Sequence, residues 1–212
     1  MGVLENCLRE DLNSRAERRM AVLDPLKITI ENYPVDKQEM VVGKNHPQNP
    51  DFGTREIPFS REIYIERDDF MEDAPRKFFR LAPGREVRLR FAYYITCKDV
   101  LKNDDGSIRE LICSYDPESQ GGNTADGRKV KGTIHWVSAK HAQNSTVRVY
   151  DRLFNVSNPG NWKTFIAHLI LIQLSLTKMR SLNLVFPGKN SHWHSNLKDW
   201  VISSLIPIPH QS

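Results

Sequence analysis

Hydrophobic and polar residues alternate along several short runs of the chain. In the first run Leu26, Ile28 and Ile30 fall on one side of the backbone, and polar residues separate them. The same alternation recurs in four later runs, at residues 61–66, 85–95, 130–136 and 146–154. A period of two residues is typical of a strand with one buried face. The pattern therefore predicts a mainly β protein built from short strands.

The run at 85–95 is the longest of these predicted strands. Its alternation places Val87 and Phe91 on the buried face and Tyr94 on the outer face. A little further along, the sequence Asn-Asp-Asp-Gly at 103–106 predicts a hairpin turn.

Helical spacing occurs in the N-terminal segment, where Leu4, Leu8 and Leu12 recur every four residues. This spacing predicts one short packing helix. Residues 34–60 contain four prolines and two glycines, which is the composition of loops and edge strands. Short strands, polar turns and little helix together favour β-barrels.

Composition narrows the possible partners. The formal net charge of +4 favours an anionic partner. The three cysteines are scattered without a Cys-x-x-Cys pair, so we expect no disulfide framework, no zinc site and a reducing compartment such as the cytoplasm. The longest apolar run, at 165–176, is shorter than the roughly 20 residues that a membrane-spanning helix needs.

Basic residues concentrate at 76–90, where six Arg or Lys residues accompany one Glu. Phe78 and Phe79 lie within this cluster. Guanidinium groups and aromatic rings suit unpaired RNA bases, which are recognised by hydrogen bonding and stacking. The alternative is that the phenylalanines belong to the core and the charges form a solvated face. Composition alone favours that alternative, because a basic face encodes no sequence specificity.

Longer motifs carry a family resemblance. The most specific are Asp-Gly-Arg-Lys-Val-Lys-Gly-x-Ile-His-Trp-Val-Ser at 126–138 and Tyr-Asp-Arg-Leu-Phe at 150–154, and further matches lie at 7–13, 20–33, 45–70 and 84–93. Over about residues 4–169 the chain resembles the anticodon-binding region of glutaminyl-tRNA synthetase. The resemblance implies a monomer whose partner is tRNA(Gln).

The same resemblance implies a division of the chain. Residues 1–23 would be the end of a helical connector to a catalytic domain, and 24–125 the first anticodon-binding β-barrel. Residues 126–169 would begin a second, incomplete β-barrel, and 170–212 would be a tail that does not belong to the family.

Three arginines are expected to read the anticodon. By resemblance, Arg18 lies in the linker before the first barrel, Arg80 precedes a glycine-containing turn and Arg88 lies in the Glu-Val-Arg-Leu-Arg strand. Phe79 stands where family members can carry Lys. Weaker correspondences add two anticodon contacts, Asn13 and Gln48, and we expect three lysines to attract RNA phosphates: Lys77, Lys129 and Lys131.

Catalytic motifs of class I synthetases are absent from this sequence, which has neither a HIGH-like nor a KMSKS-like motif. We therefore expect no catalytic residue and no cofactor in this chain, since ATP would bind the missing catalytic domain, and no aminoacylation by the chain alone. His135 is expected to be a structural hydrogen-bonding residue rather than a base or ligand, because no carboxylate or Cys neighbours it at ligand spacing.

The tail departs from the family after about Leu169. Codons for residues 170–173 can spell Asn-Pro-Asp-Ser in the adjacent reading frame, and those for 194–203 permit Phe-Gln-Phe-Glu-Arg-Leu-Gly-Tyr-Phe, which resembles the family's last barrel motif. We hypothesise that about 170–212 is out-of-frame translation and is poorly packed or disordered. Coding DNA that lacks this motif in the adjacent frame would rule the idea out.

Two other functions remain open from the sequence. The chain could be a stand-alone RNA-binding β-barrel without preference for the glutamine anticodon. It could also be a non-functional truncated remnant that folds only in part.

Overall fold

A computed structural model describes residues 2–16, 18–122, 124, 126–147 and 182–187 of the 212-residue chain. Strands dominate, and the one helix within these ranges is α1, Gly2–Arg15. The first strands are β1 (Pro25–Ile30), β2 (Glu39–Lys44), β3 (Thr54–Phe59), β4 (Glu62–Glu66), β5 (Glu86–Leu89) and β6 (Tyr94–Lys102). The others are β7 (Ile108–Asp116), β8 (Thr133–Ile134), β9 (Val137–Ser138), β10 (Ala142–Val147) and β11 (Leu182–Pro187). The predicted mainly β fold with a short N-terminal helix is confirmed.

Short 3-10 turns connect several strands. They are η1 (Pro50–Phe52), η2 (Arg67–Asp69), η3 (Pro117–Gly122) and η4 (Ala139–His141).

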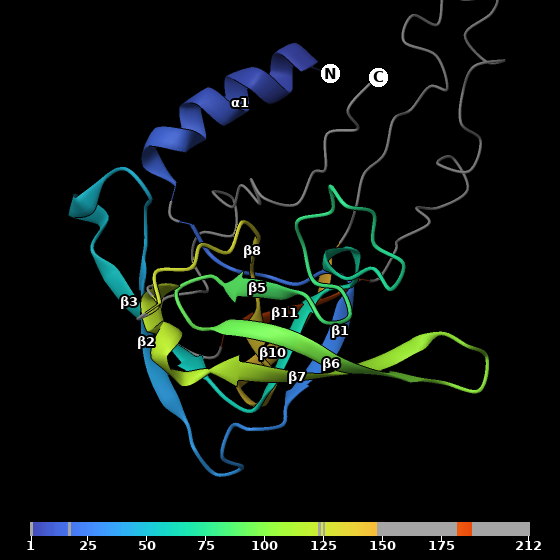
Figure 1. Cartoon of the computed structure of the whole chain (residues 1–212). Coiled ribbons are helices and arrows are strands. Elements are labelled where there is room, and N and C mark those ends of the chain that lie inside the picture. Colours follow the sequence, from blue (N-terminus) through green and yellow to red (C-terminus); the bar gives the residue numbers. More distant parts are fainter. Residues whose placement is uncertain (1, 17, 123, 125, 148–181, 188–212) are drawn as a thin grey trace, which may run out of the picture.

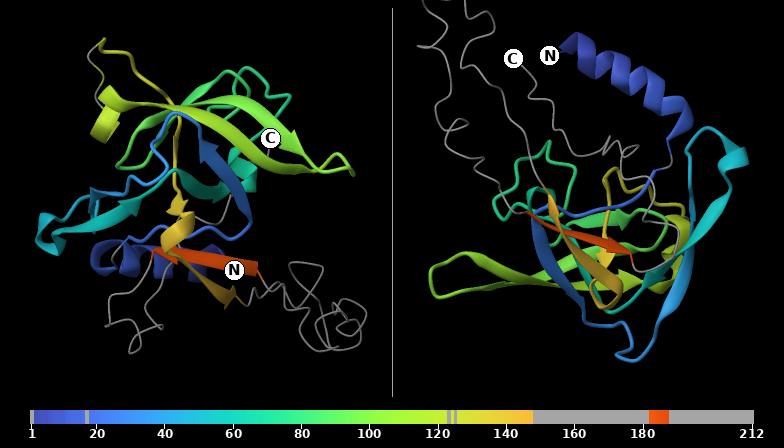
Figure 2. Two further views of the ribbon diagram at one scale, coloured as in Figure 1. Left: turned by 90° about the horizontal axis from the view of Figure 1, so that it is seen from below. Right: turned by 180° about the vertical axis from the view of Figure 1, so that it is seen from behind.

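Seven strands form one curled sheet in the order β8-β5-β6-β7-β1-β4-β9 (Figures 1 and 2). β1 runs parallel to β7 and antiparallel to β4. The two edge strands, β8 and β9, are separated by only two residues in the sequence. The segment 133–138 therefore joins both edges of the sheet and curls it toward a barrel. This segment lies within the part of the chain that we assigned to the start of a second barrel.

The predicted alternation is confirmed in the core. Leu26, Ile28 and Ile30 of β1 are completely buried, as are Ile63 and Ile65 of β4. Aromatic rings pack edge to face or tilted between them, with centroids 5.0–5.4 Å apart, in a cluster of Tyr33, Phe59, Tyr93, Tyr115 and Trp136. Such pairs add about 0.5–1.5 kcal/mol each beyond the burial of their area.

The single strand predicted at 85–95 is wrong, because a tight turn divides it into β5 and β6. The N–H of Leu89 donates to the Tyr93 carbonyl (2.8 Å), and Phe91 adopts a positive φ of 68°. Tyr94 is buried rather than outward, because η3 covers it: its hydroxyl donates to the Gly122 carbonyl (2.9 Å). The hairpin predicted at 103–106 is confirmed between β6 and β7, with Gly106 at φ 83°.

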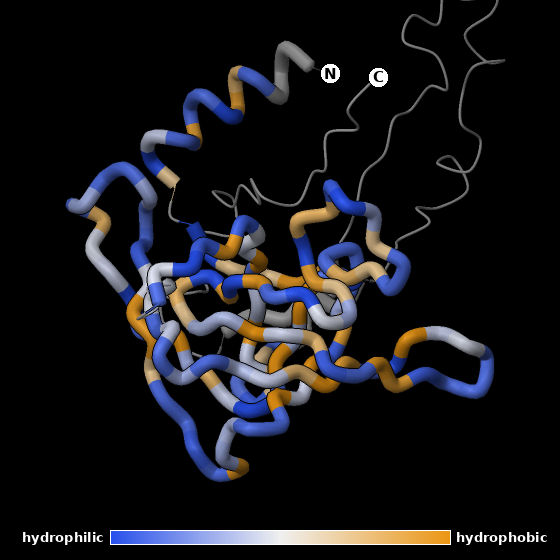
Figure 3. The backbone as a smooth tube through the Cα atoms, viewed as in Figure 1, coloured by the Kyte–Doolittle hydropathy of each residue, from blue (hydrophilic) through white to orange (hydrophobic). Residues whose placement is uncertain are grey.

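Helix α1 projects away from the barrel at an angle, and its C-terminal end lies nearest the barrel (Figure 1). Leu12 and Ala16 are buried, whereas Leu8 is 49% exposed. Hydrophobic positions are scattered among hydrophilic ones along this helix (Figure 3). The predicted leucine stripe is therefore not buried as one continuous face.

The tail contributes one described strand. β11 pairs antiparallel with β10, so that Asn144 lies opposite Val185. The sequence did not predict this pairing. The other expectations for residues 170–212, and the strand expected beyond Val147, lie outside the described residues.

Candidate nucleic-acid interface

Three of the predicted anticodon contacts gather where α1 meets the loop between β2 and β3. The guanidinium of Arg18 donates through Nη2 to Asn13 Oδ1 (2.8 Å) and through Nη1 to the Ala16 carbonyl (3.0 Å). The backbone N–H of Arg18 donates to the Asn45 carbonyl (2.7 Å). Gln48 follows closely in the same loop. The fold thus brings Asn13, Arg18 and Gln48 together from separate segments.

His46 connects the loop between β2 and β3 to the end of α1. The sequence analysis did not identify His46. The ring is 4% exposed, and its Nδ1 accepts from the N–H groups of Gln48 (3.2 Å) and Asn49 (2.9 Å). A neutral ring whose Nδ1 accepts carries its proton on Nε2. That nitrogen lies 2.7 Å from the Asn13 carbonyl and donates to it. The available signal was the run His-Pro-Gln-Asn-Pro, in which two prolines restrict the loop around the ring.

Arg80 is paired but accessible. Its Nη1 lies 2.7 Å from Asp69 Oδ1 and donates to the Asp68 carbonyl at 3.3 Å. The Arg80 side chain is 50% exposed, whereas that of Asp69 is 7% exposed. Burial raises the pKa of Asp69, and the charge of Arg80 opposes that rise. The carboxylate therefore anchors one part of the guanidinium while the rest faces solvent.

Arg88 has no ion pair within the part of the chain that the structure describes. Its Nη2 donates to the Gly121 carbonyl (2.5 Å), and its backbone N–H donates to the Gly132 carbonyl (2.9 Å). A Cβ at Gly122 would lie 2.1 Å from Arg88 Cζ, so the backbone at 121–122 covers one side of the guanidinium. The glycine is needed for this close approach.

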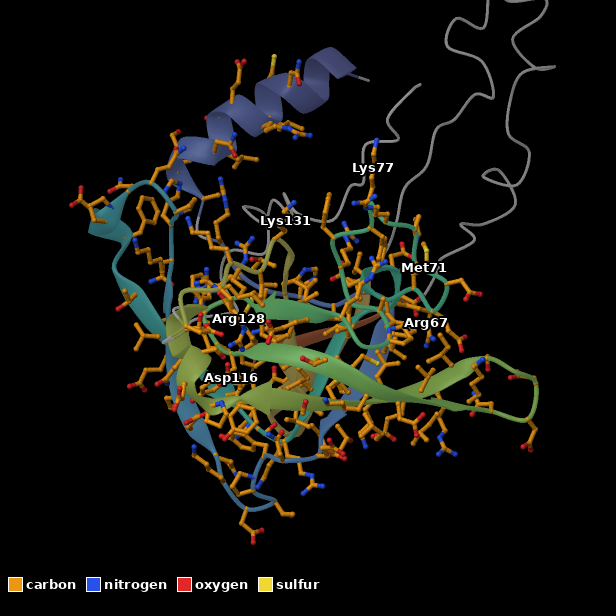
Figure 4. The ribbon with its side chains drawn as sticks, viewed as in Figure 1. Arg67, Met71, Lys77, Asp116, Arg128 and Lys131 are labelled. Carbon is orange, nitrogen blue, oxygen red and sulfur yellow. The ribbon has the colours of Figure 1, made fainter. Side chains whose placement is uncertain are left out.

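The three predicted phosphate-binding lysines, Lys77, Lys129 and Lys131, are all exposed. Figure 4 shows Lys77 and Lys131 on the side of the barrel above which α1 lies. Lys131 Nζ is 5.2 Å from the centroid of the Phe79 ring. Among the described residues none of the three lysines forms an ion pair. Their charges are available to a ligand.

Arg128 differs from these lysines, although it lies in the same segment. Its guanidinium contacts Glu86 (3.0 Å), Asp126 (2.7 Å) and Asp116, the last of which is visible beside it in Figure 4. It also lies 5.7 Å from the ring centroid of Tyr94. The hydrogen bonds to Glu86 above all, and those to the two aspartates, raise the pKa of Arg128. Arg128 therefore fastens the segment that carries Lys129 and Lys131 to β5 and β7.

His135 has a carboxylate neighbour in the fold, although none stands at ligand spacing in the sequence. Its Nε2 is 3.6 Å from Glu66 Oε1. Glu66 also accepts from the N–H groups of Leu23 (2.7 Å) and Asp24 (3.0 Å). Burial by itself would raise the pKa of Glu66, but the interactions with His135 and the two N–H groups lower it. Glu66 thus holds the chain just before β1. Among the described residues, His135 Nε2 makes no hydrogen bond, so the structural hydrogen-bonding role of His135 stays a prediction.

The described residues contain neither a candidate metal site nor a candidate membrane-spanning helix. In them, no group of His, Cys, Asp and Glu side chains could hold a metal ion. No helix of this part of the chain combines the length and apolar character needed to cross a bilayer.

Two family models match the chain, and both carry the description "tRNA synthetases class I (E and Q), anti-codon binding domain". The first covers residues 16–116 and the second residues 133–181. The second match extends past residue 169, where we expected the resemblance to end.

Curated relatives agree with this assignment. The glutamine–tRNA ligase of Rhodopirellula baltica is 57% identical over 169 residues, which cover 78% of this chain and 28% of the relative. That of Bradyrhizobium diazoefficiens is 56% identical, with 76% and 28% covered, and that of Tolumonas auensis is 56% identical, with 79% and 30% covered. This chain therefore spans less than a third of the length of these relatives. By both family matches, the chain belongs to the anticodon-binding domains of the class I tRNA synthetases for glutamate and glutamine.

Proposed function

We propose that this chain recognises the anticodon of tRNA(Gln) as the C-terminal part of a glutamine–tRNA ligase. The observation that carries the proposal is the pairing state of the basic residues on one face. Among the described residues, Lys77 and Lys131 are exposed without ion pairs, and the Arg88 guanidinium donates to one backbone carbonyl, that of Gly121. The lysines of such a face can meet RNA phosphates without first breaking an internal ion pair, whereas Arg80 is paired with Asp69 and remains half exposed.

The arginines would read bases. A guanidinium presents five N–H donors in a planar fork that matches base edges and phosphates. Arg18 and Arg80 are each fixed by one neighbouring oxygen-bearing side chain, Asn13 and Asp69 respectively. Fixing the fork before binding reduces the entropy lost when a base docks. Gln48 would add a contact from the loop that His46 orders.

The lysines would contribute charge rather than specificity. Lys77, Lys129 and Lys131 would neutralise phosphates and release counterions, so affinity should fall as salt increases. In this assignment each lysine that contacts a phosphate adds about 0.7–0.9 to the slope of log affinity against log salt.

Binding, not chemistry, is the proposed role of this chain. The matched relatives are named glutamine–tRNA ligases, and this chain spans 28–30% of their length. We propose that aminoacylation, with its ATP, takes place in a part of the enzyme that this sequence does not include. We further propose that the chain acts as a monomer in the cytoplasm and uses no cofactor of its own.

Filter binding to tRNA(Gln) and to the same tRNA with altered anticodon bases tests the proposal. We expect preference for the glutamine anticodon, and we expect Arg80→Ala to lower affinity by about tenfold, since a good base contact contributes about 1–3 kcal/mol. Arg109→Ala removes an exposed arginine on β7 and serves as the control. Equal affinity for every anticodon would favour a stand-alone RNA-binding module instead. The absence of any binding would favour a non-functional remnant.

A further inference from the structure

Phe79 places an exposed aromatic ring within the proposed RNA-binding face. It is 53% exposed, and no other described aromatic side chain is exposed to solvent to a comparable degree. A single exposed apolar residue is ordinary on a protein surface. Phe79 differs from such a residue because its loop is held by backbone contacts and because cations lie around its ring.

The loop that carries the ring is held from beneath. The guanidinium of Arg85 donates to the carbonyls of Ala74 (3.0 Å), Pro75 (3.2 Å) and Phe78 (2.9 Å). On the other side, a Cβ at Gly132 would lie 2.1 Å from the carbonyl oxygen of Phe79, so the two backbones are in close contact. The ring is therefore presented by an ordered backbone, and less entropy is lost when a ligand docks on it.

Cations surround the ring. Lys131 Nζ lies 5.2 Å from the ring centroid, and Lys77 and Arg80 belong to the same loop as Phe79. A cation over an aromatic face is attracted by the ring's quadrupole. Phe79 is still 53% exposed with this cation beside it. An apolar protein partner would have to desolvate these charges without compensating them. An unpaired nucleotide offers a flat base for the ring and a phosphate for the ammonium groups.

We propose that Phe79 stacks on an unpaired base of the bound RNA while Lys131 and Lys77 contact the adjoining phosphates. This inference rests on the proposed function, since it takes RNA as the ligand. It deepens that function by adding a contact without base preference beside the arginines that discriminate. Every base has a π-face, so the stacked ring contributes to affinity and not to anticodon choice.

The test uses the full chain and tRNA(Gln) that carries 2-aminopurine in the anticodon loop, whose fluorescence is quenched by stacking. Phe79→Leu keeps an apolar side chain but removes the aromatic ring, and Phe79→Tyr keeps the ring. We expect Phe79→Leu to weaken binding about tenfold for every anticodon, to abolish the change in fluorescence and to leave the salt slope unchanged. Phe79→Tyr should bind within about twofold of the unsubstituted chain.

Val35→Leu is the control, because Val35 is 72% exposed and belongs to the segment between β1 and β2. That segment lies at the bottom of the view in Figure 1, opposite the loop that precedes β5. If Phe79→Leu binds normally while Arg80→Ala is weakened, the stacking contact is refuted and the proposed function stands. Equal losses for Phe79→Leu and Phe79→Tyr also refute stacking. If the unsubstituted chain binds no RNA, the proposed function fails, and this inference fails with it.

Discussion

Two adjoining regions of the barrel surface carry basic side chains in opposite states. Around Arg128, carboxylates from β5, β7 and the preceding turn surround one guanidinium. Around Phe79, by contrast, Lys77 and Lys131 are exposed and have no ion pair among the described residues. Arg128 and Lys131 are three positions apart in the sequence, yet only the lysine is available to an external anion. In these two regions the pairing of the positive charges, and not their number, decides which side chains can meet an RNA phosphate.

Both regions depend on the curled sheet, so the largest expected effect comes from disrupting it. Trp136 is completely buried between β8 and β9, and its Nε1 donates to the Arg90 carbonyl (3.0 Å). We expect Trp136→Ala to lower the free energy of unfolding by about 3–5 kcal/mol and to weaken RNA binding with it. Denaturant unfolding measures the change. Unaltered stability would show that the fold does not depend on the packing of Trp136 in the segment 133–138.

Arg128→Met tests the paired region alone. Methionine keeps much of the length of the arginine side chain but removes its charge. We expect faster amide exchange in residues 126–132 and a several-fold loss of RNA affinity, since Lys129 and Lys131 lose their support. The salt slope should not change, because Arg128 itself makes no phosphate contact in this proposal. Arg109→Met is the control. A slope reduced by about one would instead make Arg128 a direct RNA contact.

The smallest expected effect is the one that protonation of Asp126 has on the stability of the fold. The hydrogen bond from Arg128 lowers the pKa of Asp126 to about 2, below the value of about 3.9 expected for an unfolded chain. Because the folded pKa is the lower one, this pairing stabilises the fold above about pH 4, and the contribution is lost as the pH falls through about 2. An NMR titration of the Asp126 carboxyl should show that low midpoint. In Arg128→Met it should move up toward 4, and a midpoint near 4 in the unsubstituted chain would contradict the pairing.

Local patterns predicted the strands well where neighbours in sequence decide the structure. The buried faces of β1 and β4 follow directly from the alternation of Leu26, Ile28, Ile63 and Ile65. The prediction of one strand at 85–95 failed because a turn can interrupt a strand without interrupting the alternation of apolar and polar residues. Alternation alone therefore does not reveal the turn between β5 and β6. The signal was hidden, since Phe91 adopts a positive φ that its residue type does not suggest.

In the candidate site, too, the sequence predicted some features and missed those that depend on contacts between distant residues. Sequence and resemblance were sufficient to identify the residue types of the RNA-binding face and to predict Arg18, Arg80 and Arg88 as its readers, which stays a prediction. They could not identify His46 as the residue that connects the β2–β3 loop to the end of α1, because its hydrogen-bond partner Asn13 is 33 positions away. They also could not predict that Glu66 lies beside His135.

By itself, the sequence determined which faces of the strands are apolar, where the β6–β7 hairpin turns and which family the chain resembles. Only the tertiary structure decided which cations are paired. Arg128 meets Glu86 and Asp116 from other strands, 42 and 12 positions away, whereas Lys131 meets the ring of Phe79. The physical reason is range: strand alternation is set by adjacent residues, whereas the pairing of a charge depends on which distant segments the curled sheet brings to it.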